Sequence, residues 1–239
     1  MLCVMKRLLL LILLAPWIQT LAQDAPSSGE KSVNPGINAR YLDPELQVDE
    51  WLQRFEVESR EVFHQRKEIL KACEVRPGMR VADIGAGTGL FTRQLSNSVG
   101  DKGWVFAVDI NARFLEHIQA RAAQEKQSNI TTVLCPQDSV SLPPDSVDLA
   151  FICDVYHHFE FPRTTLASIH RALKPGGRII LIDFIRIEGV SSEWTLGHVR
   201  AGEEVFRQEV IDAGFRFDGK LEIPGLEENY CLRFLKPGP

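Results

Sequence analysis

The residues best suited to chemistry lie in a short loop that follows a predicted strand. An apolar run ends at Asp83, and glycines follow at alternate positions, Gly85, Gly87 and Gly89. Glycine has no Cβ and adopts positive φ at little cost, so the chain can turn sharply and press its backbone against a ligand. A loop that leaves a strand and enters a helix also offers free N–H groups to an anionic group. The pattern therefore predicts a binding loop for a small charged ligand.

The glycine spacing does not fit the dinucleotide-binding fingerprint. That fingerprint is G-x-G-x-x-G. Its third glycine would fall on Leu90 if the first were Gly85, and on Thr92 if the first were Gly87. An oxidoreductase that uses a nicotinamide cofactor is therefore disfavoured. A second apolar run ends at Asp109, about 20 residues after the glycines, which is where an acid meets the ribose hydroxyls in βαβ folds.

Acidic residues follow four of the predicted strands. Asp138 and Asp154 stand just past later apolar runs, as Asp83 and Asp109 stand at the ends of earlier ones. Ligands of open α/β sheets bind outside the carboxyl ends of the strands. The four acids therefore predict an acidic, ligand-binding edge of the sheet.

Apolar runs and amphipathic segments alternate after residue 78, which predicts a parallel sheet with right-handed crossovers. Residues 42–73 have apolar side chains at helical spacing and predict one or two amphipathic helices, whereas 188–198 is expected to be a loop. We expect strands near residues 79–84, 104–109, 130–135, 147–153, 178–185, 215–222 and 229–235, and later helices near 88–98, 111–126, 161–174 and 201–213.

Taken together, the motifs resemble class I S-adenosylmethionine-dependent methyltransferases of the small-molecule, methyltransferase type 11-like kind. The resemblance rests on D-x-G-x-G-x-G from Asp83, on Asp109, and on L-K-P-G-G at 173–177 before a buried strand, and it covers about Gly78 to Phe184. It implies an α/β, Rossmann-like fold: a seven-stranded, mostly parallel sheet with the last strand antiparallel, helices on both faces, and an N-terminal helical extension. It also implies S-adenosyl-L-methionine as cofactor.

The resemblance further implies a role for each part of the acidic edge. Asp83 would favour the cationic portion of the cofactor, Asp109 would accept both ribose hydroxyls, and Ile110 would pack on the adenine. Asp138 is similar to the family acid that accepts from the adenine amino group, although the usual short glycine–acid step is missing here. The expected cofactor-binding residues are Asp83, Gly85, Ala86, Gly87, Asp109, Ile110, Asp138, Ser139 and Asp154.

The expected catalytic residues follow the run 147–153: Asp154, Tyr156 and His157. Histidine is the usual base near neutral pH, so we predict that His157 takes a proton from the methyl acceptor. The alternative is a histidine that only holds backbone. Asp154, His157 and His158 would also imitate a two-histidine, one-carboxylate metal site. Because adjacent histidines on a helix do not readily face one ion, no metal is expected.

Two further segments are expected to shape the site. The N-terminal helices, residues 41–75 with Arg60 and Glu61, would fold over the cofactor as a lid. Trp194 and His198 either line the substrate pocket or, for the tryptophan, form an aromatic anchor on the surface.

The chain of 239 residues suits one domain of ordinary size, expected over 41–239, with no internal repeat. Its formal net charge of −5 argues against a nucleic-acid binder, whose footprint is basic. A small-molecule substrate is expected instead.

The N-terminus predicts export. Lys6 and Arg7 precede an apolar run, and small Ala22 closes the segment, which is the pattern of a signal peptide over 1–22. The run is shorter than the ~20 residues that a membrane helix needs; an uncleaved membrane anchor is the alternative. Residues 23–40 are rich in Ser, Pro, Gly and Asn and predict a flexible tether. A periplasmic or secreted protein is therefore expected.

Four cysteines, Cys73, Cys135, Cys153 and Cys231, are far apart and form no C-x-x-C pair. We expect buried thiols, rather than a disulfide framework or a metal site. The sequence thus predicts an exported methyltransferase for a small molecule. The alternatives are a protein or peptide methyltransferase, which would need a broad open cleft, and a non-catalytic domain that binds the cofactor or serves as a scaffold.

Overall fold

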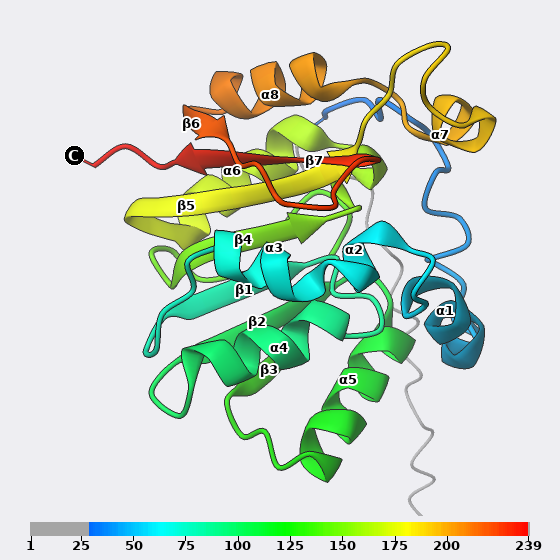
Figure 1. Ribbon diagram of the computed structural model, residues 1–239. Coiled ribbons are helices and arrows are strands. Elements are labelled where there is room, and N and C mark those ends of the chain that lie inside the picture. Colours follow the sequence, from blue (N-terminus) through cyan, green and yellow to red (C-terminus); the bar gives the residue numbers. More distant parts are fainter. Residues whose placement is uncertain (1–28, 239) are drawn as a thin grey trace, which may run out of the picture.

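A seven-stranded sheet with helices on both faces forms the body of the protein (Figure 1). The computed structural model describes residues 29–238. The predicted signal peptide and the first part of the predicted tether lie outside the described residues. The strands are β1 (Arg80–Ile84), β2 (Trp104–Asp109), β3 (Ile130–Leu134), β4 (Val147–Cys153), β5 (Leu173–Phe184), β6 (Arg216–Lys220) and β7 (Asn229–Leu235).

The strand order is β3-β2-β1-β4-β5-β7-β6. Strands β1 to β5 pair in parallel, and β7 runs antiparallel to both β5 and β6. The predicted fold class is confirmed, including the antiparallel last strand. The order reverses between β1 and β4, and in open α/β sheets ligands bind at such a switch point.

Helices cover the sheet on both sides. They are α1 (Val48–Phe55), α2 (Glu61–His64), α3 (Arg66–Ala72), α4 (Leu90–Val99), α5 (Ala112–Gln124), the 3₁₀ turn η1 (Tyr156–His158), α6 (Pro162–Ala172), α7 (Glu193–His198) and α8 (Glu203–Asp212). Of the described helices, none combines the length and the apolar character needed to cross a bilayer.

Successive residues of β1 show how the two faces are built. Val81 belongs to the same buried cluster as Leu95 of α4, whereas Ala82 belongs to the cluster on the other face, with Leu166 of α6 and Phe206 of α8. Side chains alternate between the faces of a strand, and a parallel sheet is covered on both, so its strands are apolar at nearly every position. This is why the central strands were predictable as continuous apolar runs.

The N-terminal part of the described chain differs from the expected flexible tether. From residue 29 it lies against the domain: the Val33 N–H donates to the Glu160 carbonyl at 2.9 Å, and the Ser32 hydroxyl donates to the Glu160 carboxylate at 2.7 Å. Asn38 Nδ2 donates to Gln137 Oε1 at 2.8 Å and to the His158 carbonyl at 3.0 Å. Its polar residues therefore serve as hydrogen-bonding partners and do not mark a linker.

Two other segments also differ from expectation. The lid region forms three short helices, α1 to α3, where one or two were expected. The expected loop at 188–198 contains α7. Ser192 caps this helix, since its side chain accepts from the Thr195 N–H at 3.1 Å, and Glu193 places a negative charge in the first turn. The sequence contained this capping signal, but the helix is only six residues long and has too few apolar residues to show a helical pattern.

The cysteines of the described chain are free thiols. Cys73 and Cys231 are buried, and Cys135 and Cys153 are partly exposed. Burial raises the pKa of Cys73, Cys135 and Cys231, so these side chains stay uncharged.

Candidate functional site

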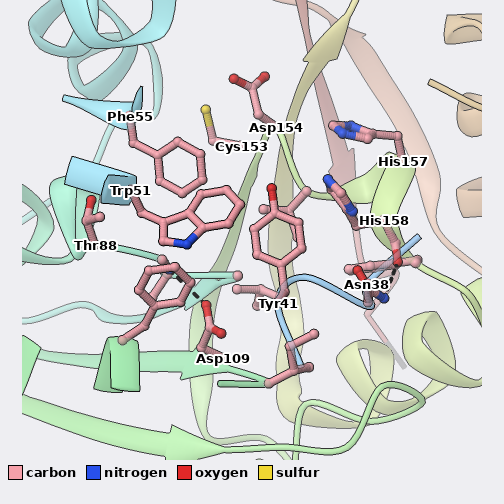
Figure 2. A pocket seen from close by; sticks show the side chains of 18 of the residues that line it. Asn38, Tyr41, Trp51, Phe55, Thr88, Asp109, Cys153, Asp154, His157 and His158 are labelled. Atoms are coloured by element: carbon pink, nitrogen blue, oxygen red, sulfur yellow. Dashed lines mark hydrogen bonds between the residues drawn. The ribbon is translucent and has the colours of Figure 1, made fainter. Parts of the chain in front are cut away.

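A cavity of about 810 Å³ opens at the carboxyl ends of β1, β2 and β4, beside the switch point. The loops after these strands form its floor, and the N-terminal segment with α1 forms its cover (Figure 2). Volumes of roughly 300–1,000 Å³ are typical of sites for small molecules and cofactors. The cavity is therefore large enough for a cofactor and a small second ligand.

Glycine is required at two positions of the loop after β1. Gly85 has φ of +70°, and a Cβ there would lie 2.5 Å from both methyl carbons of Val155. Gly89 has φ of +79°, and its Cβ would lie 2.7 Å from Ile118 Cγ1. The loop thus packs tightly against the loop after β4 and against α5. The predicted cofactor residues Gly85, Ala86 and Gly87 line the cavity.

Asp109 lies at the end of β2 and holds the glycine loop in place. Its Oδ2 accepts from the Gly87 N–H at 2.8 Å, and its Oδ1 accepts from the Asn111 N–H at 2.9 Å. Burial raises the pKa of Asp109 to about 6, against the lowering effect of these hydrogen bonds. Each carboxylate oxygen keeps a further lone pair for a ligand. Ile110, predicted to contact the cofactor, also lines the cavity.

Asp83 is buried at the end of β1 and accepts a hydrogen bond from the Thr92 hydroxyl. Burial raises the pKa of Asp83 to about 7. The hydrogen bond from Thr92 lowers this pKa, and the negative charge of Asp109 raises it further. Neither Asp83 nor Asp109 forms an ion pair with a described residue. This end of the cavity therefore holds two carboxylates that a cationic ligand would stabilise.

The predicted acid Asp138 takes a different position. It is buried, but it is not among the residues that line the cavity, whereas its neighbours Gln137 and Ser139 are. Gln137 is a residue that sequence reasoning missed. Its only signal was its place beside Asp138 in a loop that follows a strand.

Asp154 closes the cavity rather than facing its centre. Its side chain is 3% exposed, pairs with Arg60 and accepts from Asn229 Nδ2 at 2.6 Å. Burial raises its pKa, and the guanidinium of Arg60 opposes this. Glu61 accepts from the backbone N–H groups of residues 227–229. The expected lid residues Arg60 and Glu61 thus join the N-terminal helices to β4 and β7.

Tyr156 does not occupy the catalytic position that was predicted for it. It is fully buried, and its hydroxyl donates to Glu209 at 2.8 Å, away from the residues that line the cavity. Successive side chains of a 3₁₀ turn diverge by about a third of a turn. Tyr156 therefore enters the core while the two histidines of η1 reach the cavity.

His157 lines the cavity and is held by a buried acid. Its Nδ1 lies 2.7 Å from Asp183 Oδ1, and its backbone N–H donates to Asp183 Oδ2 at 3.0 Å. Asp183 is fully buried within β5. The contact leaves Nε2 as the ring nitrogen available to a ligand. Sequence reasoning missed Asp183; the signal was a single acid inside the apolar run that forms β5, which must have a partner there.

Two more histidines adjoin His157. The ring centroids of His157 and His158 are 4.3 Å apart, and Nε2 of His158 lies 3.3 Å from Nε2 of His198. Burial, and then the other two histidines, lower the pKa of His158 to about 2. Trp194 stacks on His198 with 4.6 Å between ring centroids, and both residues line the cavity. This agrees with the first of the two expectations for these residues, a place in the pocket wall.

Aromatic side chains from the N-terminal segment form the cover, and sequence reasoning missed them as site residues. Tyr41, Trp51 and Phe55 project between Asp109 and Asp154 (Figure 2). Tyr41 and Trp51 are 4.7 Å apart between ring centroids, and Phe114 of α5 packs on Trp51 at 6.1 Å. An apolar cover of this kind excludes water from bound ligands.

Comparison with known proteins agrees with this geometry. Residues 82–181 match a family of methyltransferase domains. The ubiquinone/menaquinone biosynthesis C-methyltransferase of Shewanella oneidensis is 30% identical over 120 residues, which are 50% of this chain and 48% of that protein. The chain thus aligns with about half the length of such curated relatives.

Solved structures share the fold. A SAM-dependent methyltransferase from Aquifex aeolicus superposes with a TM-score of 0.69 at 22% identity, covering 80% of this chain and all of that one. Phosphoethanolamine N-methyltransferase 2 of Haemonchus contortus, solved with S-adenosyl-L-methionine, has a TM-score of 0.56 at 22% identity, covering 71% and 44% of the two chains.

S-Adenosylmethionine is the methyl donor of the matching family. The glycine loop, the acid at the end of β2 and the strand order 3-2-1-4-5-7-6 all lie within or around the matched region. Residues 82–181 are therefore a methyltransferase domain of the class I S-adenosylmethionine-dependent type.

Proposed function

We propose that the protein transfers a methyl group from S-adenosylmethionine to a small molecule bound in the same cavity. One observation carries the proposal. A single cavity joins the glycine loop, Asp83 and Asp109 at one end to the His157–Asp183 pair at the other. The first end suits a cofactor with a cationic and a ribose portion, and the second offers a ring nitrogen to an acceptor.

The residues at the acidic end fit the cofactor. Asp83 and Asp109 have raised pKa values and neutral partners, so a sulfonium and an ammonium brought nearby would stabilise their ionised forms. The spare lone pairs of Asp109 suit a ribose diol. Ile110 offers an apolar surface to a base, and Gln137 and Ser139 lie beside it as polar partners.

S-Adenosylmethionine, when bound, supplies a methyl group activated by a positive sulfur. The chain must then hold an acceptor in line and exclude water, and orientation alone accounts for roughly 7–11 kcal/mol of such barriers. Asp183 accepts from Nδ1–H of His157, which fixes the tautomer with a lone pair on Nε2. That lone pair accepts a hydrogen bond from, or takes the proton of, the acceptor.

The cover favours a small acceptor over a protein chain. Arg60 and Glu61 tie the N-terminal helices to Asp154 and to residues 227–229, and the three aromatic rings line the cavity beside them. A protein substrate would need a broad cleft, which this cover occupies. Relatives named for ubiquinone/menaquinone biosynthesis and for phosphoethanolamine support the same conclusion.

The function is tested through Asp109. Asp109→Ala should weaken S-adenosylmethionine binding by about 1.5–3 kcal/mol, the range for hydrogen bonds to charged groups. Isothermal titration calorimetry measures this, with exposed Asp101→Ala as the matched control and Asp109→Asn as a variant that keeps the side-chain shape. An unchanged affinity would remove Asp109 from the cofactor site, and a wild-type chain that binds no cofactor would refute the proposed function.

Cofactor affinity should rise with pH because of Asp83. With a pKa of about 7 in the free protein, this carboxyl is neutral at pH 6. A bound cation favours the ionised form and lowers that pKa, so binding releases a proton below pH 7. We expect affinity to rise roughly five- to tenfold from pH 6 to 7.5. Calorimetry at both pH values should find this dependence lost in Asp83→Asn, and a flat wild-type profile would contradict it.

His157 should matter for turnover but not for cofactor binding. His157→Ala should lower kcat by about 10²-fold or more, the usual size of a positioned proton acceptor, while the Kd for S-adenosylmethionine stays within about twofold. S-Adenosylhomocysteine release with the best acceptor from a small-molecule panel measures the first, and calorimetry the second. A joint loss of both would give His157 a structural role, and unchanged turnover would remove it from the reaction.

We also propose that the protein is exported, on the basis of the charged, apolar and small-residue pattern of residues 1–22. Mass spectrometry of the protein recovered outside the cytosol should then find a mature N-terminus near Gln23. An intact Met1 in a membrane fraction would instead support an uncleaved anchor.

A further inference from the structure

Three histidines converge on the cavity wall away from Asp109. His157 and His158 come from η1, and His198 comes from the last turn of α7, forty residues later. One ring nitrogen of each lies within 4.8 Å of those of the other two. Figure 2 shows the rings of His157 and His158 side by side at the right of the cavity, with Asp109 at the lower left.

We propose that His157, His158 and His198 bind a divalent transition-metal ion, zinc in the first place, at the acceptor end of the cavity. The sequence did not lead us to expect adjacent histidines around one ion, yet the ring centroids of His157 and His158 lie only 4.3 Å apart. Asp154, which the sequence offered as the carboxylate ligand of such a site, instead pairs with Arg60 and accepts a hydrogen bond from Asn229. The third ligand comes from α7.

The spacing suits tetrahedral coordination. With metal–nitrogen distances of 2.0–2.1 Å, two nitrogens of a tetrahedral zinc site stand about 3.3 Å apart. His158 Nε2 and His198 Nε2 are 3.3 Å apart already. A hydrogen bond between these two nitrogens uses the lone pair of only one of them. A metal ion between them would use the lone pairs of both. The third nitrogen, from His157, lies within 4.8 Å of both.

The surroundings of the cluster resemble the support that metal-bound histidines need. Ligating histidines usually donate their second ring N–H to a carboxylate, which fixes the tautomer and raises the basicity of the ligand nitrogen. Asp183 accepts from His157 Nδ1 in this way at 2.7 Å. Trp194 stacks on His198 with 24° between the rings and so fixes its orientation. Both contacts exist in the protein before any ion is bound.

Three neutral imidazoles select the metal and leave a position open. Imidazole suits zinc, copper, nickel and cobalt better than the harder magnesium or calcium. Catalytic zinc sites have three protein ligands and a fourth position that is open to water or substrate. The three histidines would leave such a position open to the cavity. Because the ligands carry no charge, the ion keeps its full positive charge. Resting on the proposed function, we assign the fourth position to an acceptor oxygen or sulfur. With the ion bound, Nε2 of His157 is a metal ligand and no longer receives the acceptor's proton, so the hydroxyl or thiol gives its proton to water as it coordinates the ion.

The test measures metal binding without turnover. The full chain, without an affinity tag and freed of metal by a chelator, is titrated with zinc chloride in a calorimeter. One zinc should bind per chain. His198→Ala should weaken binding at least 100-fold, because a ligand is lost. Asp183→Asn should weaken it by about 10–100-fold, the usual effect of removing the partner of a ligating histidine. His64→Ala, at an exposed histidine of α2, is the control and should leave affinity within twofold.

Cobalt(II) gives an independent readout of the geometry. Bound in place of zinc, it should show the intense visible bands of four-coordinate cobalt, and these should disappear in His198→Ala. Addition of 2-mercaptoethanol should then produce a sulfur-to-cobalt charge-transfer band. If no thiol band appears, the fourth position is closed and the assignment of the acceptor class is wrong.

The outcomes separate the metal site from the proposed function. A chain that binds zinc equally well after His198→Ala, or binds none, would overturn the metal site, even if S-adenosylmethionine still binds. A chain that binds zinc through the three histidines but does not bind S-adenosylmethionine would keep the site and refute the methyltransferase. Because His198 lies in a short, half-buried helix, its substitution is the least damaging to the fold, and thermal melting of each variant verifies this.

Discussion

The burial of carboxylates at one edge of the sheet is the constraint on which this structure depends. Asp83, Asp109, Asp154 and Asp183 follow or end four parallel strands, and all four are buried. A buried charge is costly unless it is paired. Asp154 is paired with Arg60, and Asp183 accepts hydrogen bonds from the ring and backbone N–H groups of His157, so the protein's own groups stabilise this half of the edge. Asp83 and Asp109 have only hydroxyl and backbone partners, so the other half depends on a ligand for its positive charge.

The N-terminal segment covers part of this edge. Its contribution is partly electrostatic, through Arg60, and partly apolar, through Trp51 and its aromatic neighbours. Arg60 is 26% exposed while Asp154 is 3% exposed, so water reaches one partner and reduces the cost of separating them.

The strands and the acidic end were predictable because each depends on local pattern. Strands buried on both faces appear as apolar runs, and Asp83 and Asp109 mark where two such runs stop. Features that depend on partners distant in the chain were not predictable. The docking of residues 29–40 requires Glu160, and the position of His157 requires Asp183, which the sequence shows only as an acid within an apolar run. Tyr156 was assigned to the cavity because sequence proximity to His157 does not reveal the direction of a side chain on a 3₁₀ turn.

The two ends of the cavity are coupled through the tight packing of the glycine loop. Gly85 lies against Val155, so closely that a Cβ would have no room. Val155 stands between Asp154, which holds the lid, and η1, which carries two of the three clustered histidines. Packed interiors transmit displacement rather than absorb it. The glycine loop is therefore one packing contact away from the segment that carries both the lid contact and two of the clustered histidines, and any side chain larger than glycine at position 85 would displace that segment.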